Sequence, residues 1–167
     1  RITQLINKTN QFNLTTRRYT EQQVAAMETS AAHHTLQISL VDRFGDNGMI
    51  CVVICNVAAH EWQIDSWLMS CRVLNRKVEE AVCNRVAAAA LAAGATRLVG
   101  LYLPTARNGI VADLYAKLGF MQAPGDGPEQ RWELDLAHFT PLEVPMAENT
   151  AESAAAPTAQ PAAETAA

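Results

Sequence analysis

The sequence predicts an α/β fold in which a mixed, mostly antiparallel sheet is covered by helices on both faces. Three consecutive β-type stretches are joined by short turns, which predicts an antiparallel meander. The middle stretch is apolar on both alternations, as expected for a strand with both faces buried. The later part of the chain alternates helical and β-type stretches, which indicates a layered α/β arrangement.

The predicted elements follow in chain order. We expect helices over residues 2–10, 20–27, 78–93 and 108–118, and strands over residues 36–44, 49–57, 62–73, 97–103 and 131–136. Thr20 with Gln23 three positions later is the pattern of a capping box, so the second helix begins there. Gly94 and Gly119 are the expected stops of the last two helices.

Length and composition indicate one domain. The chain has 167 residues, of which 49% are hydrophobic, enough for a single core. We expect the domain to occupy residues 1–140 and an Ala/Pro-rich linker or disordered tail to occupy residues 141–167, since from about Ala147 onward the chain lacks aromatic residues, Val and Ile. Because the chain begins at Arg1 rather than Met, we expect it to be part of a longer protein.

Charge and cysteine content exclude several classes of partner. The net charge of −4 disfavours binding of nucleic acid through bulk positive charge. No apolar run approaches the length of a membrane span, and no export signal opens the chain, so we expect no membrane partner and a cytoplasmic location. The four cysteines lack metal-ligand spacing and are expected to be reduced core thiols. His33, His34 and His60 likewise lack such spacing, so no metal site is predicted.

Local motifs carry a family resemblance. The order of elements and the segment from Asn108 to LYAKLGF resemble the GNAT fold, that of the acyl-CoA N-acyltransferases. Together with NKTNQFNLTTRRYT, DRFGDNG, SWLMSCRVL and GLYLPTARN, residues 1–136 resemble the C-terminal acyltransferase-like half of FkbH-like proteins, members of HAD subfamily IIIC in polyketide biosynthesis.

The resemblance implies a role in loading a glyceryl unit. In that family an upstream HAD domain uses 1,3-bisphosphoglycerate, and the glyceryl group ends on the phosphopantetheine arm of an acyl carrier protein. HAD chemistry needs a DxDx[TV] motif and Mg²⁺, and no such motif occurs in this chain. The implied partners are therefore the upstream HAD domain and the carrier protein. Two alternatives stay open: an autonomous acyltransferase that uses acyl-CoA, and a non-catalytic scaffold.

The turn before the third predicted helix is the candidate cofactor site. In the GNAT pattern such a turn aims backbone N–H groups at the CoA diphosphate. Asn75 and Lys77 stand where small residues are usual, and the alternative is a solvated helix start whose cations pair with Glu79 and Glu80. The resemblance assigns CoA or carrier-bound phosphopantetheine to Arg72, Val73, Leu74, Asn75, Arg76, Lys77, Val78 and Asn108.

Three side chains are candidates for chemistry. Tyr115 matches the GNAT position of a general acid that protonates the leaving thiolate; the alternative is a packing role. Asp65 is a candidate base, or else a carboxylate paired with an arginine. Cys71 is a candidate acyl carrier, or else a buried inert thiol.

The resemblance also places a substrate-acceptor loop near the start of the chain. Its residues are Asn10, Gln11, Phe12 and Asn13, three amides around one aromatic ring, a composition suited to an amide-rich ligand such as pantetheine. The alternative is a hinge to the upstream domain. Arg17 and Arg18 either face a partner or form a solvated pair.

Overall fold

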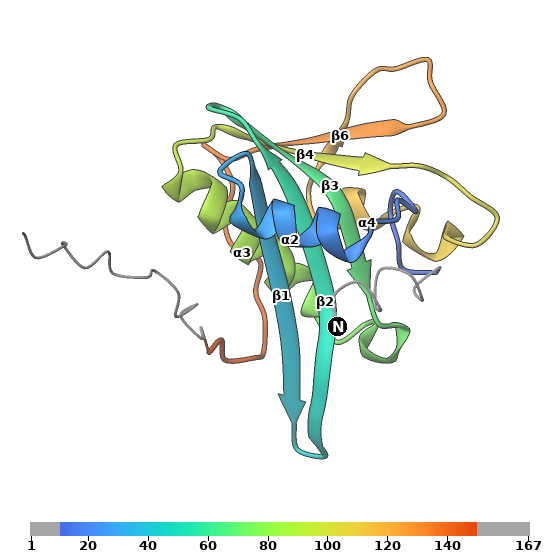
Figure 1. Ribbon diagram of the computed structural model, residues 1–167, viewed down its shortest axis with the longest axis vertical. Helices are drawn as coiled ribbons and strands as arrows, with labels where there is room; N and C mark the ends of the chain where they lie inside the picture. The colour runs from blue at the N-terminus through green and yellow to red at the C-terminus, as the bar shows by residue number, and fades with distance from the viewer. Residues whose placement is uncertain (1–10, 150–167) are drawn as a thin grey trace, which may run out of the picture.

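A computed structural model describes residues 11–149 (Figure 1). Within this range, six strands form one sheet in the order β1-β2-β3-β4-β6-β5. The strands are β1 (His33–Asp42), β2 (Gly45–Val57), β3 (Glu61–Met69), β4 (Arg97–Tyr102), β5 (Met121–Gln122) and β6 (Gln130–Asp135). The helices are α2 (Glu21–Thr29), α3 (Val78–Ala92) and α4 (Leu114–Lys117), with 3-10 turns η1 (Cys71–Val73) and η2 (Gly109–Val111).

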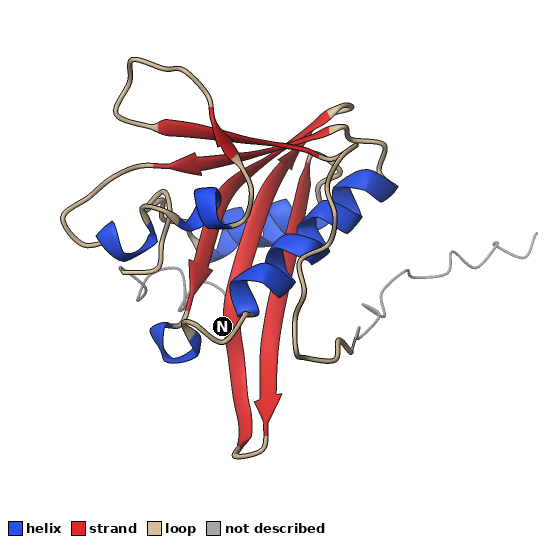
Figure 2. Cartoon of the chain, turned by 180° about the vertical axis from the view of Figure 1, so that it is seen from behind, coloured by secondary structure: helices blue, strands red, loops and turns tan. Residues whose placement is uncertain are grey.

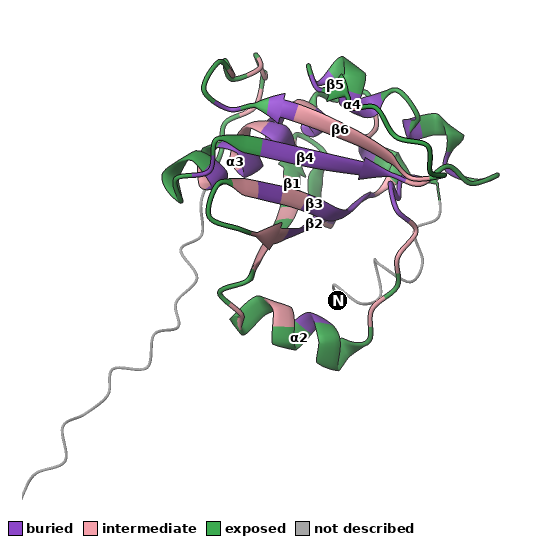
Figure 3. Cartoon of the chain, turned by 90° about the horizontal axis from the view of Figure 1, so that it is seen from above, coloured by how far each residue is buried: buried purple, intermediate pink, exposed green. Residues whose placement is uncertain are grey.

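Helices cover the two faces of the sheet, as expected (Figures 2 and 3). On one face Val24 of α2 packs against Val52, Ile54 and Leu68. On the other face α3 and α4 close the larger core, to which Val82 and Val86 belong. The middle strand is therefore buried on both sides, and every residue from Ile50 to Cys55 is buried.

The predicted meander and long helix are confirmed. β1 pairs antiparallel with β2, and β2 pairs antiparallel with β3. The Thr20 and Gln23 side chains form the expected capping box of α2. Helix α3 ends at the predicted position because Gly94 adopts a left-handed backbone with φ of 84°.

Three predictions differ from the structure or lie outside it. The helix expected over residues 108–118 is wrong: the chain forms η2 and α4, two short pieces joined at Ala112–Asp113. The third strand ends at Met69, so the last predicted strand residues belong to η1. The strand β5 was not predicted, since two residues carry no periodicity. The helix expected over residues 2–10 lies outside the described range.

The chain after β6 returns across α3. The Asn84 side chain donates to the Leu142 carbonyl and accepts from the Leu142 N–H, both at 2.8 Å. Leu142 and Met146 are partly buried against the main core. Packing against the domain thus continues past residue 140, through Met146.

The strands β3 and β4 form a parallel pair at the centre of the sheet. β3 and β4 pair in parallel only from Glu61–Arg97 to Ile64–Gly100, and beyond that point the two strands separate. The segment around Asn13 takes the free edge of β3: the Leu14 N–H donates to the Trp67 carbonyl and the Met69 N–H to the Phe12 carbonyl, both at 3.2 Å. This N-terminal segment therefore completes the sheet where β4 leaves it.

Candidate functional site

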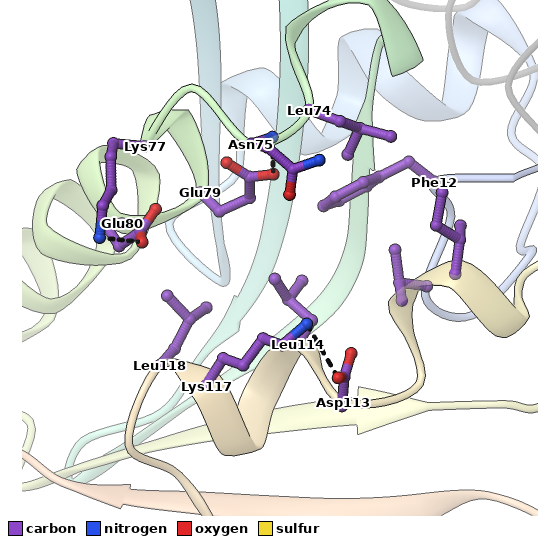
Figure 4. Close-up of a pocket in the computed structure, with 12 residues that line it drawn as sticks. Phe12, Leu74, Asn75, Lys77, Glu79, Glu80, Asp113, Leu114, Lys117 and Leu118 are labelled. Carbon is purple, nitrogen blue, oxygen red and sulfur yellow. Dashed lines mark hydrogen bonds and ion pairs between the residues drawn. The ribbon is translucent and has the colours of Figure 1, made fainter.

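A cavity of about 270 Å³ lies between the N-terminus of α3 and the η2–α4 region (Figure 4). Phe12 closes one side of the cavity, and the loop before α3, with Leu74, Asn75 and Lys77, forms another side. The lining residues are Phe12, Leu74, Asn75, Lys77, Glu79, Glu80, Ile110, Val111, Asp113, Leu114, Lys117 and Leu118.

The predicted cofactor turn lies only partly at this cavity. Leu74, Asn75 and Lys77 line it. Val73 and Val78 are buried in the main core instead. Arg72 is exposed, and its Nε donates to the Ser70 hydroxyl at 3.3 Å. The guanidinium of Arg76 points to the β1–β2 hairpin, where it pairs with Asp42 at 3.0 Å.

The backbone of the turn is unusual. Asn75 and Lys77 both have left-handed backbones, with φ of 61° and 65°. Asn tolerates this region well and Lys tolerates it less readily. The turn directs the Asn75 N–H to Glu79, whose Oε1 accepts it at 3.4 Å.

The charges around the cavity pair locally (Figure 4). Lys77 contacts Glu80 at 3.0 Å, and Lys117 contacts Asp113 at 2.8 Å. The Lys77–Glu80 pair agrees with the alternative in which the cations at the helix start pair with Glu79 and Glu80, whereas Arg76 pairs with Asp42 of β1 instead. The buried carboxylate of Glu79 is different, because its Oε2 has no hydrogen-bond partner among the described residues.

Tyr115 is a core residue in this structure. Its ring lies against Phe120 with centroids 5.0 Å apart and also contacts Trp67 and Trp132. The hydroxyl lies beside the backbone of Leu101 without a hydrogen bond of good geometry, and burial holds the pKa of the phenol well above its usual value. This geometry favours the packing alternative over a general acid.

We therefore expect Tyr115→Phe to leave the fold intact. Removing a buried hydroxyl without a partner removes a desolvation cost, so the free energy of unfolding should stay within about 1 kcal/mol of wild type or rise. Urea denaturation measures this change. A loss of several kcal/mol would show that the hydroxyl makes a strong hydrogen bond and would contradict this description.

Asn108 joins segments that are distant in the sequence. Its Nδ2 donates to the carbonyls of Asn13 and Leu103, both at 2.9 Å. Its Oδ1 accepts from the N–H and the hydroxyl of Thr105. All four hydrogen-bonding positions of this fully buried amide are thus used within the protein. Asn108 stands at the N-cap position of η2, but its side chain makes no capping hydrogen bond there.

The predicted acceptor loop is largely interior. Phe12 and Asn13 are buried, and Phe12 reaches the cavity. Gln11 is exposed, and Asn10 lies outside the described residues. The loop therefore closes the space between the separating strands β3 and β4 rather than lying open at the surface.

Asp65 lies in a polar cluster beside α2. It pairs with Arg17, and it accepts hydrogen bonds from the hydroxyls of Tyr19 and Ser66. Arg17 also pairs with Glu129 at 3.0 Å. The paired alternative thus describes Asp65. The sequence did not identify Tyr19 as a partner of Asp65 or Glu129 as the second partner of Arg17, because these residues lie far apart along the chain.

This cluster predicts an alkaline transition in stability. Burial, and next the hydrogen bond to Asp65, raise the pKa of Tyr19 to about 12. The unfolded phenol ionises near its usual value of 10, so the stability contributed by Tyr19 is present below pH 10 and is lost as the pH rises to 12. Difference absorbance titration against Tyr19→Phe measures this pKa. Asp65→Asn should lower it only in part, and an ordinary pKa in wild type would contradict the described contacts.

The four cysteines divide into two groups. Cys51, Cys55 and Cys83 are buried, as expected, and burial raises the pKa of the Cys83 thiol to about 12. Cys71 is exposed, so its description as a buried thiol is wrong; its Sγ lies 3.5 Å from the Gln11 Oε1.

Within residues 11–149, no group of three or more His, Cys, Asp and Glu side chains is arranged to hold a metal ion. In the same range, no helix combines the length and apolar character needed to cross a bilayer.

The residues that sequence reasoning missed lie mainly on the far side of the cavity. Lys117 comes from α4 and Asp113 from the N-cap position before it, and their i,i+4 spacing was the available signal. Glu79 was considered only as a partner for neighbouring cations. Nothing in the local sequence shows that its carboxylate turns inward.

Comparison with solved structures identifies the fold. No family model and no curated protein sequence matches this chain. The GNAT domain of S. lividans PAT is similar, with a TM-score of 0.57 and 19% identity over 71% of this chain and 70% of that domain. The ribosomal-protein-S18-alanine N-acetyltransferase of Escherichia coli has a TM-score of 0.55 and 16% identity, covering 79% and 82% of the two chains.

A third similar structure is the PaiA N-acetyltransferase of Thermoplasma acidophilum in complex with coenzyme A. Its TM-score is 0.53 at 13% identity, covering 67% of this chain and 66% of that one. These likenesses show that the chain has the GNAT fold, which confirms the predicted fold class.

Proposed function

We propose that this chain is an acyl-handling domain of an FkbH-like protein, which receives the acylated phosphopantetheine arm of a carrier protein in the cavity between α3 and α4. The acyl unit is the glyceryl group that an upstream HAD domain prepares with Mg²⁺. The fold supports acyl transfer in general, since the similar structures are acetyltransferases. The motifs shared with FkbH-like proteins supply the more specific part.

The observation that carries the proposal is the cavity itself. Its volume of about 270 Å³ lies below the roughly 300–1,000 Å³ of pockets for drug-sized ligands. The narrow phosphopantetheine chain of a carrier protein fits a cavity of this size better than a whole molecule of coenzyme A with its nucleotide. Apolar side chains, among them Phe12, Leu74 and Leu114, line it together with polar groups, which suits a chain of methylenes and amides.

The alternative of an autonomous enzyme that uses acyl-CoA has less support. It is favoured by the likeness to a structure that contains coenzyme A. It relied on Tyr115 as the acid and on free N–H groups in the turn, but the Tyr115 hydroxyl is buried and the Asn75 N–H is taken by Glu79.

The test compares a polyketide-synthase carrier protein with and without its phosphopantetheine arm. Calorimetry should show that the carrier protein that bears the phosphopantetheine arm binds at least about tenfold more tightly than the carrier protein without it. This corresponds to a contribution of about 1.4 kcal/mol from the arm to the binding free energy. Equal binding of the two forms would contradict the proposal.

A matched pair of variants locates the contact. Ile110 lies at the cavity and is exposed, so Ile110→Glu should remove the advantage of the armed carrier. Val41 is also an exposed apolar residue but lies near the tip of the β1–β2 hairpin, so Val41→Glu should retain that advantage. Loss of the advantage in both variants, or in neither, would contradict binding at this cavity.

A further inference from the structure

Glu79 is the one charged side chain of the cavity that is buried. Only 9% of the residue is exposed. Its Oε1 accepts the Asn75 N–H, whereas its Oε2 is buried and has no hydrogen-bond partner in the described part of the chain. A buried carboxylate oxygen without a donor is costly, so the negative charge of Glu79 is poorly compensated and disfavours a second negative charge beside it.

The position of Glu79 also determines the charge at the helix start. The N-terminus of a helix favours a negative charge, and a turn like this one binds anions through its free N–H groups. Here Glu79 supplies that negative charge in the first turn of α3 and accepts the N–H of Asn75. The carboxylate therefore stands where an external anion would be held.

The other charged side chains of the cavity do not neutralise the negative charge of Glu79. Lys77 is paired with Glu80, and Lys117 is paired with Asp113. The cavity thus keeps an excess negative charge beside the turn. A ligand with a diphosphate would meet repulsion from Glu79, in addition to the loss of the Asn75 N–H.

We propose that Glu79 is a specificity-determining residue, whose charge beside the turn excludes diphosphate-bearing ligands from this cavity and so leaves it to an uncharged ligand. This inference rests on the proposed function, and it identifies the ligand class as the uncharged pantetheine part of the arm. Coenzyme A carries the same pantetheine chain, but its diphosphate brings negative charge to the turn.

Calorimetric titration with pantetheine, coenzyme A and inorganic pyrophosphate tests the inference. Wild type should bind pantetheine at least about tenfold more tightly than coenzyme A. Glu79→Gln keeps the shape of the side chain and an acceptor for Asn75, so it should raise the affinity for coenzyme A and for pyrophosphate by about tenfold. The matched control is Glu28→Gln, which removes an exposed carboxylate of α2 on the opposite face of the sheet and should change these affinities less than about threefold.

Three results would overturn the inference: tighter binding of coenzyme A than of pantetheine by wild type, unchanged pyrophosphate affinity in folded Glu79→Gln, or an equal gain in Glu28→Gln. Its failure is distinguishable from failure of the proposed function. A gain of pyrophosphate binding in Glu79→Gln supports the role of Glu79 even if an armed carrier binds no better than one without the arm. An armed carrier that binds better, with no effect of Glu79→Gln, supports only the proposed function.

Discussion

Replacing Gly100 with alanine is expected to destabilise the domain by about 3 kcal/mol, because overpacking a rigid core forces strained side chains and backbone shifts. Gly100 lies in β4, and a Cβ there would meet three ring atoms of Tyr115 at 2.2 to 2.7 Å. The ring cannot withdraw easily, since Trp67, Phe120 and Trp132 surround it. Urea denaturation monitored by tryptophan fluorescence measures the loss.

A second glycine provides the control. A Cβ at Gly109 would have no atom within 4 Å, and Gly109 has no positive φ, so Gly109→Ala should change the stability by less than about 1 kcal/mol. If Gly100→Ala were as stable as Gly109→Ala, the close packing of Tyr115 on β4 would be wrong.

Replacing Asn108 with alanine is expected to cost a similar amount, about 3 kcal/mol, because buried groups would lose their hydrogen-bond partners. The change leaves the carbonyls of Asn13 and Leu103 without the donor that joins them. It should also loosen the segment that lies along β3, so the amides of Leu14 and Met69 should exchange with solvent faster.

Hydrogen exchange followed by NMR separates this effect from a general loss of stability. Asn47 makes side-chain hydrogen bonds only within the β1–β2 hairpin, so Asn47→Ala should leave the exchange of Leu14 and Met69 unchanged. Unaltered exchange in Asn108→Ala would contradict the role of Asn108 in holding the N-terminal segment.

The sequence predicted the elements whose pattern is local and long. The meander and α3 follow from alternation, helical composition and glycine stops, and the structure contains them. The region of residues 108–118 was misjudged, since one helix was expected where two short helical pieces form. The side chain of Asn108 turns inward to distant carbonyls, and this long-range contact overrides the local pattern.

The candidate site could be predicted only in outline. The turn before α3 was located from its place after β3 and from the family resemblance. The partners that determine its chemistry come from elsewhere in the chain: α4 and its N-cap supply Lys117 and Asp113, and the N-terminal segment supplies Phe12. Likewise, Asp65 meets Arg17 and Tyr19 only after the sheet has formed. Contacts between segments so far apart leave no periodic signal in the sequence.

The central claim is that the cavity between α3 and α4 receives the arm of a carrier protein. The most direct measurement is an NMR titration of the isotope-labelled chain with the carrier, comparing the form that bears the phosphopantetheine arm with the form that lacks it. We predict that only the armed form shifts the amide signals of Asn75, Leu114 and Lys117 at the cavity. The same shifts with both forms, or shifts of the armed form confined to other surfaces, would contradict the claim.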